Sequence, residues 1–292
     1  MPSRLDARAV ALAIIIMAIL GGTYTMVKVG LRDLPVVGSL LLRMLVAAVA
    51  LGMYACWARV PLRYRGRAAW FIAAGTLAFI AMQLLLYAGL TVTPAGRAAI
   101  LYNIQPFLTL LVLPRVLPAE RLTVRRALGT GVAFVGVMFV LAKRGASGGS
   151  LLGDGLVLLA AATWTVVIIL SKMTPNEVNA VSLIFWNVAG AAPVLALLAV
   201  VVEPTVTWRL SAPAVASILY LGVLAAGVGF VGFVWLTRTY AATRVNAFVF
   251  LSPVFGVLIA WGALGESVTA LTGCWCARGR IRYLDREHGE LM

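Results

Sequence analysis

The sequence has 292 residues, of which 62% are hydrophobic and only 12% are charged. A soluble domain carries about a quarter charged residues, so this chain has too few polar side chains to cover a water-facing surface. The formal net charge of +14 sits mostly on Lys and Arg between long apolar blocks, where such residues set topology and contact anionic headgroups. Membrane lipid is therefore the expected partner of this charge, and no folded soluble module remains to bind nucleic acid.

Nine apolar blocks are long enough to cross a membrane, since a helix needs about 20 apolar residues, with a range of about 17 to 25, to span the hydrocarbon core. Taken in chain order with charges as boundaries, the predicted spans are approximately 9–27, 35–57, 69–91, 97–115, 126–142, 155–171, 179–201, 212–236 and 244–265. The fifth is short, but its glycines suit close packing against a neighbouring helix. Irregular backbone would be costly at membrane depth, so we expect an all-α membrane protein.

The distribution of Lys and Arg predicts the orientation of the chain. With the N-terminus inside, the inner segments hold 13 Lys and Arg, and the outer segments hold six. The inner set includes the clusters at 59–67 and 115–126. The positive-inside rule therefore places the N-terminus of this expected integral membrane protein in the cytoplasm.

The two halves of the sequence resemble each other. The corresponding positions are Pro106 and Pro253, Glu120 and Glu266, Lys28 and Lys172, and Arg43 and Asn187. Their common order predicts a duplication, with a first unit at 1–144 and a second at 145–266. If each unit contains five spans, an odd number, the second crosses the membrane in the opposite direction. Such inverted repeats are the geometric basis of alternating access.

Several loose patterns carry a resemblance to a known family. They are Gly-Gly-Thr-Tyr before Lys28, Arg43, the run Asn103…Pro106…Glu120, the pair Trp164…Lys172, and Asn246…Pro253…Leu-Gly-Glu266. Over residues 9 to 266 the chain resembles the EamA family of the drug/metabolite transporter superfamily. The resemblance implies a bundle of ten helices in two inverted five-helix repeats, cytoplasmic termini, and export or exchange of amino acids, other metabolites or drugs.

The C-terminal segment, 267–292, departs from that pattern. A tenth span should follow Glu266, but only eleven uncharged residues, Ser267 to Ala277, come before a polar tail rich in Arg. Eleven residues cannot cross a membrane. We therefore expect a degenerate tenth span, a truncated or frame-shifted remnant, and an intact reading frame on resequencing that is unchanged in close relatives would refute this.

Arg43 is the first candidate for contact with a substrate. It is the only charge well inside an apolar block, and an ionisable group at that depth is costly and typically functional. It could attract a substrate carboxylate or phosphate. The alternative is that its long side chain reaches the nearer interface or pairs with helix carbonyls.

Pro106 and Pro253 are expected to kink their helices or to act in gating, because proline removes an amide donor and obstructs the bond to the preceding turn. Polar and aromatic residues around them and in other spans are candidates for lining a cavity, although interhelical hydrogen bonds use the same residue types. These further cavity candidates are Thr23, Tyr24, Gln83, Tyr87, Tyr102, Asn103, Gln105, Trp164, Trp186, Asn187, Trp235, Asn246 and Ser252.

We expect a transporter of small molecules rather than an enzyme, with no metal and no cofactor. The chain has one His, and no Asp or Glu is expected within a span, which argues against intramembrane catalysis and against obligate proton coupling. Flux of substrate driven by an imposed pH gradient would contradict the second point. A flippase for a lipid-linked sugar or phosphate, and a non-transporting membrane subunit, remain alternatives, and the sequence leaves the oligomeric state open.

Overall fold

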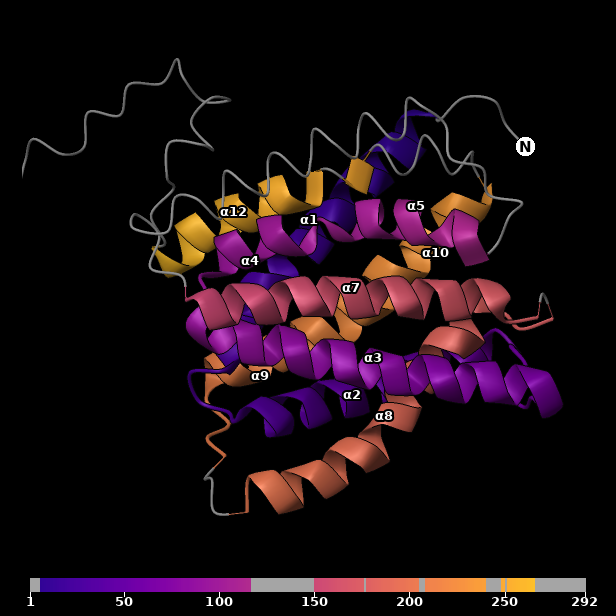
Figure 1. Cartoon of the computed structure of the whole chain (residues 1–292), viewed down its shortest axis with the longest axis horizontal. Coiled ribbons are helices and arrows are strands. Elements are labelled where there is room, and N and C mark those ends of the chain that lie inside the picture. The colour runs from indigo at the N-terminus through magenta and orange to yellow at the C-terminus, as the bar shows by residue number, and fades with distance from the viewer. Residues whose placement is uncertain are drawn as a thin grey trace, which may run out of the picture.

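The computed structural model describes residues 6–116, 150–175, 177–204, 208–239, 248–249 and 251–265, and these residues form helices and connecting segments without a strand. The predicted fifth span, Glu120, Asn246, Glu266 and the C-terminal segment lie outside this part of the chain. The helices lie side by side in a bundle, and α3 and α7 pack along each other (Figure 1).

Six of the described helices are long and apolar enough to cross a membrane. Five are single α-helices: α1 (Ala7–Gly30), α2 (Val36–Trp57), α3 (Gly66–Val92), α7 (Leu151–Met173) and α8 (Ala180–Val202). The sixth, Ala212–Phe233, is built from α9 (Ala212–Leu219), a π-helix η2 (Tyr220–Phe230) and the start of α10 (Val231–Thr239). At 1.5 Å per residue, helices of this length exceed the roughly 30 Å of hydrocarbon in a bilayer.

The predicted fourth span is divided in two. Helix α4 (Ala95–Tyr102) ends before Asn103, and α5 (Gln105–Val116) begins two residues later, with Pro106 as its second residue. Proline suits the first turn of a helix because its missing amide hydrogen has no partner there in any case. The side chain of Asn103 donates a hydrogen bond of 2.7 Å to the carbonyl of Ala99, at the C-terminal end of α4. The break therefore places the polar side chains of Asn103 and Gln105 within an otherwise apolar segment.

Short polar side chains begin four of the described helices. Asp6, Ser150, Asn179 and Ser211 each precede a helix and accept a hydrogen bond from an amide of its first turn. These side chains satisfy amide donors that the helix itself leaves unpaired. The N-terminal ends of α1, α7, α8 and α9 are thus determined by capping residues that precede the apolar segments.

At one end of the bundle, the last turn of α1 meets the residues that join α3 to α4. The Nζ atom of Lys28 donates a hydrogen bond of 3.1 Å to the carbonyl of Thr93, which follows α3. The amide of Ser150, which precedes α7, donates to the carbonyl of Val92 at 3.4 Å. Helices α1 and α3 therefore end, and α7 begins, at this end, which we call the Lys28 end.

At the opposite end, the connection between α2 and α3 meets the start of α8. The hydroxyl of Tyr64 accepts a hydrogen bond of 3.3 Å from the amide of Asn179 and lies 3.1 Å from the hydroxyl of Ser182. The indole nitrogen of Trp186 donates to the carbonyl of Leu62 at 2.8 Å. Helix α2 therefore ends, and α3 and α8 begin, at this Tyr64 end.

The end of α8 returns to the Lys28 end. The carboxylate of Glu203 accepts hydrogen bonds of 2.9 and 3.0 Å from the amides of Val37 and Gly38, in the first turn of α2. The carbonyl of Asp33 accepts a bond of 3.2 Å from the amide of Arg209, just before α9. Consequently α7 runs opposite to α1, α8 opposite to α2, and the α9–η2–α10 segment opposite to α3.

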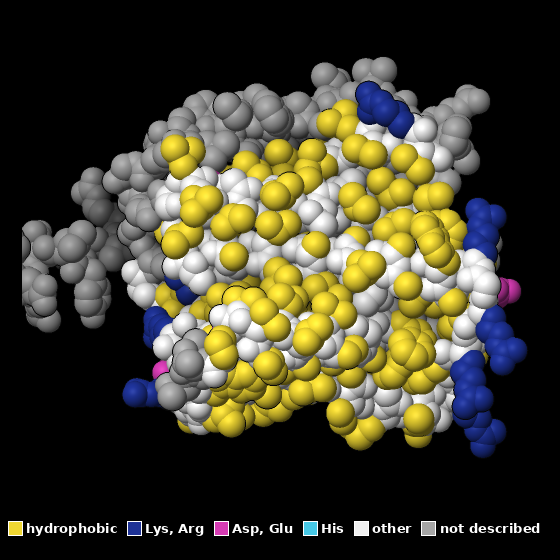
Figure 2. Space-filling model, turned by 60° about the horizontal axis from the view of Figure 1, so that its bottom comes forward, with side chains coloured by type: hydrophobic (Ala, Val, Ile, Leu, Met, Phe, Trp, Pro, Cys, Tyr) yellow, Lys and Arg dark blue, Asp and Glu magenta, His cyan; other side chains and the backbone are white. Residues whose placement is uncertain are grey.

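The surface of the bundle is apolar between its two ends. Large side chains on α2, α7 and α8 are exposed, among them Val49, Leu159 and Val200. In Figure 2, a broad face of hydrophobic side chains separates the charged side chains at its two ends. This is the pattern of a protein whose solvent on that face is lipid rather than water.

Glycines let some of these helices approach to backbone contact. A Cβ atom built on Gly21 of α1 would lie 2.5 Å from the carbonyl oxygen of Ser252 and 2.9 Å from the amide of Gly256, both in α12 (Leu251–Leu264). Small residues at such a crossing allow the close packing that drives helix association in membranes.

We expect Gly21→Ala to lower the melting temperature in detergent, because the new methyl group would meet backbone atoms that cannot rotate away. Overpacking of this kind typically costs about 1–3 kcal/mol. The matched control is Gly155→Ala: Gly155 is exposed on α7, and a Cβ there would meet nothing within 4 Å. If both variants melt at the same temperature, the close contact between α1 and α12 is wrong.

Candidate functional site

Arg43 is the eighth of the 22 residues of α2 and is buried, with 5% of its surface exposed. Its Nη1 atom donates a hydrogen bond of 3.1 Å to the hydroxyl of Tyr87, and its guanidinium carbon lies 5.8 Å from the centre of that ring. Its Nε atom is buried without a hydrogen-bond partner in the described structure. Among the described residues, no carboxylate pairs with Arg43. The site therefore holds a positive charge whose donors are incompletely used.

Arg43 faces a small cavity of about 30 Å³, which we call the Arg43 cavity. Five helical elements contribute side chains to it: α2, α3, α7, α8 and η2. Its lining residues are Arg43, Met44, Ala47, Phe79, Trp164, Ile184, Asn187, Val188, Ala226 and Phe230. Mostly apolar walls with a few polar groups are the usual lining of a small-molecule site.

One wall of the cavity is aromatic. The ring of Trp164, in the middle of α7, lies between those of Phe79 and Phe230, with ring centres 6.4 and 5.9 Å away. These distances are typical of interacting aromatic pairs, which hold one another in fixed orientations. The wall gives the cavity a rigid apolar surface next to the guanidinium of Arg43.

Asn187 and Gln83 add amide groups in or near this region. Asn187 lines the cavity, and its Oδ1 atom lies 3.4 Å from the hydroxyl of Thr76. Gln83 is buried one helical turn from both Phe79 and Tyr87 on the same face of α3, and its Nε2 atom has no hydrogen-bond partner in the described structure. An unsatisfied buried donor is costly and often marks a site for a ligand or water.

A second group of predicted residues lies around the break between α4 and α5. The ring centre of Tyr102 is 5.9 Å from that of Tyr24, and its hydroxyl is 3.4 Å from the sulfur of Met82. The Nε2 atom of Gln105 donates to the hydroxyl of Thr109 at 2.8 Å. These side chains satisfy one another locally, and Tyr24, Tyr102, Asn103 and Gln105 are not among the residues that line the Arg43 cavity.

The remaining predicted residues are not among the lining residues either. Trp235 is half exposed on α10, and Trp186 is partly exposed at the Tyr64 end. Ser252 is buried and Pro253 partly buried near the start of α12, while Thr23 is partly buried on α1. The structure thus brings Arg43, Trp164 and Asn187 together at the cavity, with Tyr87 bound to Arg43. The gating roles of Pro106 and Pro253 remain predictions.

The expectation that no acidic residue lies within a span is wrong for Asp154. It is the fourth residue of α7, is 1% exposed, and forms an ion pair with Arg97, which is 6% exposed in α4. Burial of both is tolerated because each neutralises the other. In the sequence both charges stand at the edge of an apolar block, so only the packing of α4 against α7 reveals the pair. No group of three or more potential metal ligands occurs among the residues that the structure describes.

A cavity with a buried charge, enclosed by membrane-spanning helices, is typical of membrane transport proteins. The chain belongs to the EamA-like transporter family, which matches residues 7–142 and 151–276. It is an integral membrane transporter of the EamA type, in the drug/metabolite transporter superfamily.

Relatives with transporter names support this assignment. A protein named "Probable terminal-alkyne amino-acid exporter" from Streptantibioticus cattleyicolor is 32% identical over 246 residues, which are 82% of this chain and 80% of the relative. "Uncharacterized transporter YoaV" from Bacillus subtilis is 25% identical over 256 residues, covering 85% and 86% of the two chains. A "Probable amino-acid metabolite efflux pump" from Escherichia coli is 28% identical over 273 residues, covering 89% and 88%.

A solved crystal structure has a similar fold. It matches with a TM-score of 0.67 at 19% sequence identity and covers 94% of this chain and 95% of its own. At that identity the likeness concerns the fold alone.

We expect Tyr87→Phe to destabilise the folded protein by about 1–3 kcal/mol, because it leaves a buried N–H group of Arg43 without its acceptor. The change should appear as a lower melting temperature in detergent. Tyr54→Phe is the control, because it removes the same hydroxyl group from a side chain of α2 that is 41% exposed. Equal melting temperatures for Tyr87→Phe and the unaltered protein would contradict the bond.

Proposed function

We propose that this transporter exports small metabolites that carry a carboxylate, such as amino acids and related compounds, by alternating access through the Arg43 cavity. The observation that carries the proposal is the buried guanidinium of Arg43, which has an unused Nε donor and no carboxylate partner among the described residues. The names of two relatives, an amino-acid exporter and an amino-acid metabolite efflux pump, support it.

A carboxylate would complete the interactions of Arg43. A guanidinium presents donors in a planar fork that matches a carboxylate, and charge-assisted bonds of this kind are roughly twice as strong as neutral ones. The cavity excludes much of the competing water, so the attraction is less screened than at a surface. Asn187, and Gln83 if it turns toward the ligand, would supply further polar contacts.

The aromatic wall favours substrates with an apolar portion. Trp164, Phe79 and Phe230 offer ring faces on which an aliphatic or aromatic side chain would pack. The same faces would also stabilise an α-ammonium group by cation–π contact. An amino acid held by its carboxylate at Arg43 would therefore meet suitable surfaces on both of its other substituents.

Alternating access is supported by the directions of the helices. Helices α7, α8 and α9–η2–α10 run opposite to α1, α2 and α3, and the family matches the chain twice in succession. We infer two inverted five-helix repeats, the second with a degenerate tenth span, that meet at the cavity through α2 and α3 on one side and α7, α8 and η2 on the other. Two such units can exchange conformations and so open the cavity to either side of the membrane.

The Lys28 end is proposed to face away from the cytoplasm. Arg59, Arg63, Arg65 and Arg67 lie in the connection and first residues that join α2 to α3, at the Tyr64 end. By the positive-inside rule that end belongs in the cytoplasm. The N-terminus would then be cytoplasmic, in a bacterial inner membrane.

The structure leaves more possibilities for the driving force of transport than the sequence alone suggests. Obligate proton coupling is disfavoured only if no acidic residue lies within a span, and the buried Asp154 removes that premise. Substrate exchange, facilitated diffusion and proton coupling are all compatible with the described residues.

The lining of the cavity by five helical elements favours a central binding site over the lateral groove that a lipid flippase requires. A non-transporting subunit would carry no flux when purified. Both alternatives are therefore separated from the proposal by flux measurements with a water-soluble substrate.

We expect Arg43→Ala to abolish counterflow of a radiolabelled mixture of L-amino acids into proteoliposomes preloaded with the same unlabelled mixture. Loss of a buried charge partner costs at least about 2 kcal/mol, or roughly 30-fold in affinity. Arg43→Lys should retain part of the flux, because it keeps the charge but loses the planar fork.

The matched control is Arg32→Ala, which removes an exposed Arg from the connection between α1 and α2. It should transport like the unaltered protein. Counterflow that survives Arg43→Ala in a folded sample would refute the role of Arg43, and absence of amino-acid counterflow in the unaltered protein would refute the substrate class.

A further inference from the structure

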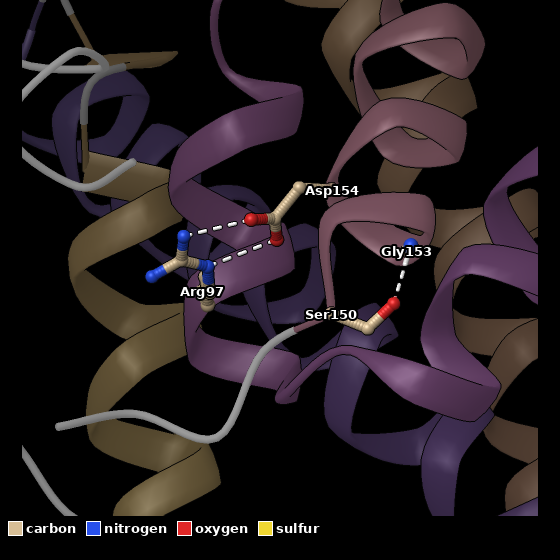
Figure 3. Close-up of polar contacts among 4 residues, drawn as sticks. All are labelled: Arg97, Ser150, Gly153 and Asp154. Atoms are coloured by element: carbon tan, nitrogen blue, oxygen red, sulfur yellow. Dashed lines mark hydrogen bonds and ion pairs between the residues drawn. The ribbon is translucent and has the colours of Figure 1, made fainter. Parts of the chain in front are cut away.

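The buried ion pair between Arg97 and Asp154 is separate from the Arg43 cavity. The Nε and Nη2 atoms of Arg97 lie 2.9 and 2.7 Å from the two carboxylate oxygens of Asp154, and the side chains are 4% and 2% exposed. Figure 3 shows the two side chains meeting between α4 and α7, with the helix-capping bond from Gly153 to Ser150 nearby. Two parallel bonds fix the orientation of the groups as well as their distance.

The pair joins the two halves of the chain at the Lys28 end. Arg97 is the third residue of α4, which follows α3, and Asp154 is the fourth residue of α7. The contact between Ser150 and Val92 and that between Lys28 and Thr93 lie at the same end. Separation of the halves at this end would therefore require the pair to break.

Packing is dense around the pair. A Cβ atom built on Gly153 would lie 2.2 Å from Thr93 Oγ1, and one on Gly89 would lie 2.8 Å from a methyl group of Val157. Leu90 is completely buried. By contrast, a Cβ atom on Gly75, which is buried nearer to the Tyr64 end, would meet a single atom within 4 Å, at 3.9 Å. The described residues of the two halves are thus closely packed around the pair at the Lys28 end.

The physical chemistry of a buried ion pair suits an interface that opens. Such a pair adds little stability compared with apolar side chains of similar size, so a purely structural contact has no need of it. In a dry interface the two charges attract strongly, but once water enters, each is solvated and the attraction falls. Apolar side chains behave in the opposite way, because opening exposes them to water at a cost proportional to their area.

We propose that Arg97 and Asp154 form the gate of the Lys28 end. The pair is closed while the Arg43 cavity faces the Tyr64 end, and it separates and hydrates when the cavity faces the Lys28 end. The proposal rests on the proposed function, because a gate presupposes alternating access. It assigns a role in the transport cycle to two residues that do not line the substrate cavity.

The opening of the gate can be measured without any substrate. Cys56, Cys274 and Cys276 are replaced by Ser, and Met44→Cys places a single thiol in the cavity. Labelling by a membrane-impermeant maleimide is followed in right-side-out and inside-out vesicles. A parallel sample with Arg32→Cys, exposed at the Lys28 end, shows which preparation presents that end.

We expect Asp154→Asn to raise the rate of labelling at Met44→Cys from the Lys28 end about tenfold, because the closed state loses a charge-assisted contact that the hydrated open state lacks. Labelling from the Tyr64 end should not rise. An unchanged rate from the Lys28 end would overturn the proposal.

The double variant Arg97→Leu/Asp154→Leu separates a gate from a structural contact. A structural contact predicts normal transport, because apolar residues replace a buried pair without loss of stability. The gate predicts a melting temperature at or above that of the unaltered protein, together with a labelling rate from the Lys28 end and an amino-acid counterflow that both fall about tenfold, since opening now exposes apolar surface. Normal labelling and counterflow in this variant would refute the gate.

The two readouts distinguish failure of the gate from failure of the proposed function. If the unaltered protein carries no amino-acid counterflow, the substrate proposal fails, while the labelling rates still decide the gate. If counterflow is normal and neither variant changes labelling from the Lys28 end, the gate alone fails.

Discussion

A positive charge held inside an apolar helix bundle is the constraint on which the rest of this structure depends. Burial of the charged guanidinium of Arg43 in an apolar surrounding is costly, so it must be balanced by contacts. Tyr87 contacts the guanidinium of Arg43 through both its hydroxyl and its ring. The Nε atom of Arg43 has no hydrogen-bond partner among the described residues. The aromatic wall of the cavity then gives this incompletely satisfied charge an apolar surrounding, and together they define a site for an anionic group with an apolar neighbour.

The arrangement of the helices places that site between α2 and α3 and the later elements α7, α8 and η2. The same bundle carries a second buried cation, Arg97, but there the guanidinium donates hydrogen bonds to both oxygens of a carboxylate. The contrast between the two arginines is informative. A neutralised pair at one end can close an interface, whereas a buried guanidinium without a carboxylate partner among the described residues can hold a ligand, and the proposed transport cycle uses both.

Much of the fold follows from the sequence because bilayer thickness fixes how long an apolar helix must be. The segments predicted at 35–57 and 179–201 are the helices Val36–Trp57 and Ala180–Val202. Arg43 is detectable in the same way, as a charge in an apolar block. The sequence does not identify Phe79 and Phe230 as residues that line the cavity. Apolar residues fill every span, and only packing decides which of them face a cavity. The ion pair of Asp154 is hidden for a related reason: a charge near a helix end is solvated or buried according to the neighbouring helix, which periodicity does not reveal.

The central claim is that Arg43 binds a carboxylate, and the most direct test compares ligands that differ in that group alone. The melting temperature of the detergent-purified protein would be measured with L-amino acids and with the corresponding L-amino acid amides, for example L-phenylalanine and L-phenylalaninamide. A ligand that binds only the folded state raises this temperature. The account predicts stabilisation by at least one carboxylate and none by its amide, with no difference between the two in Arg43→Ala. Equal stabilisation by acid and amide, or a preference that persists in Arg43→Ala, would contradict it.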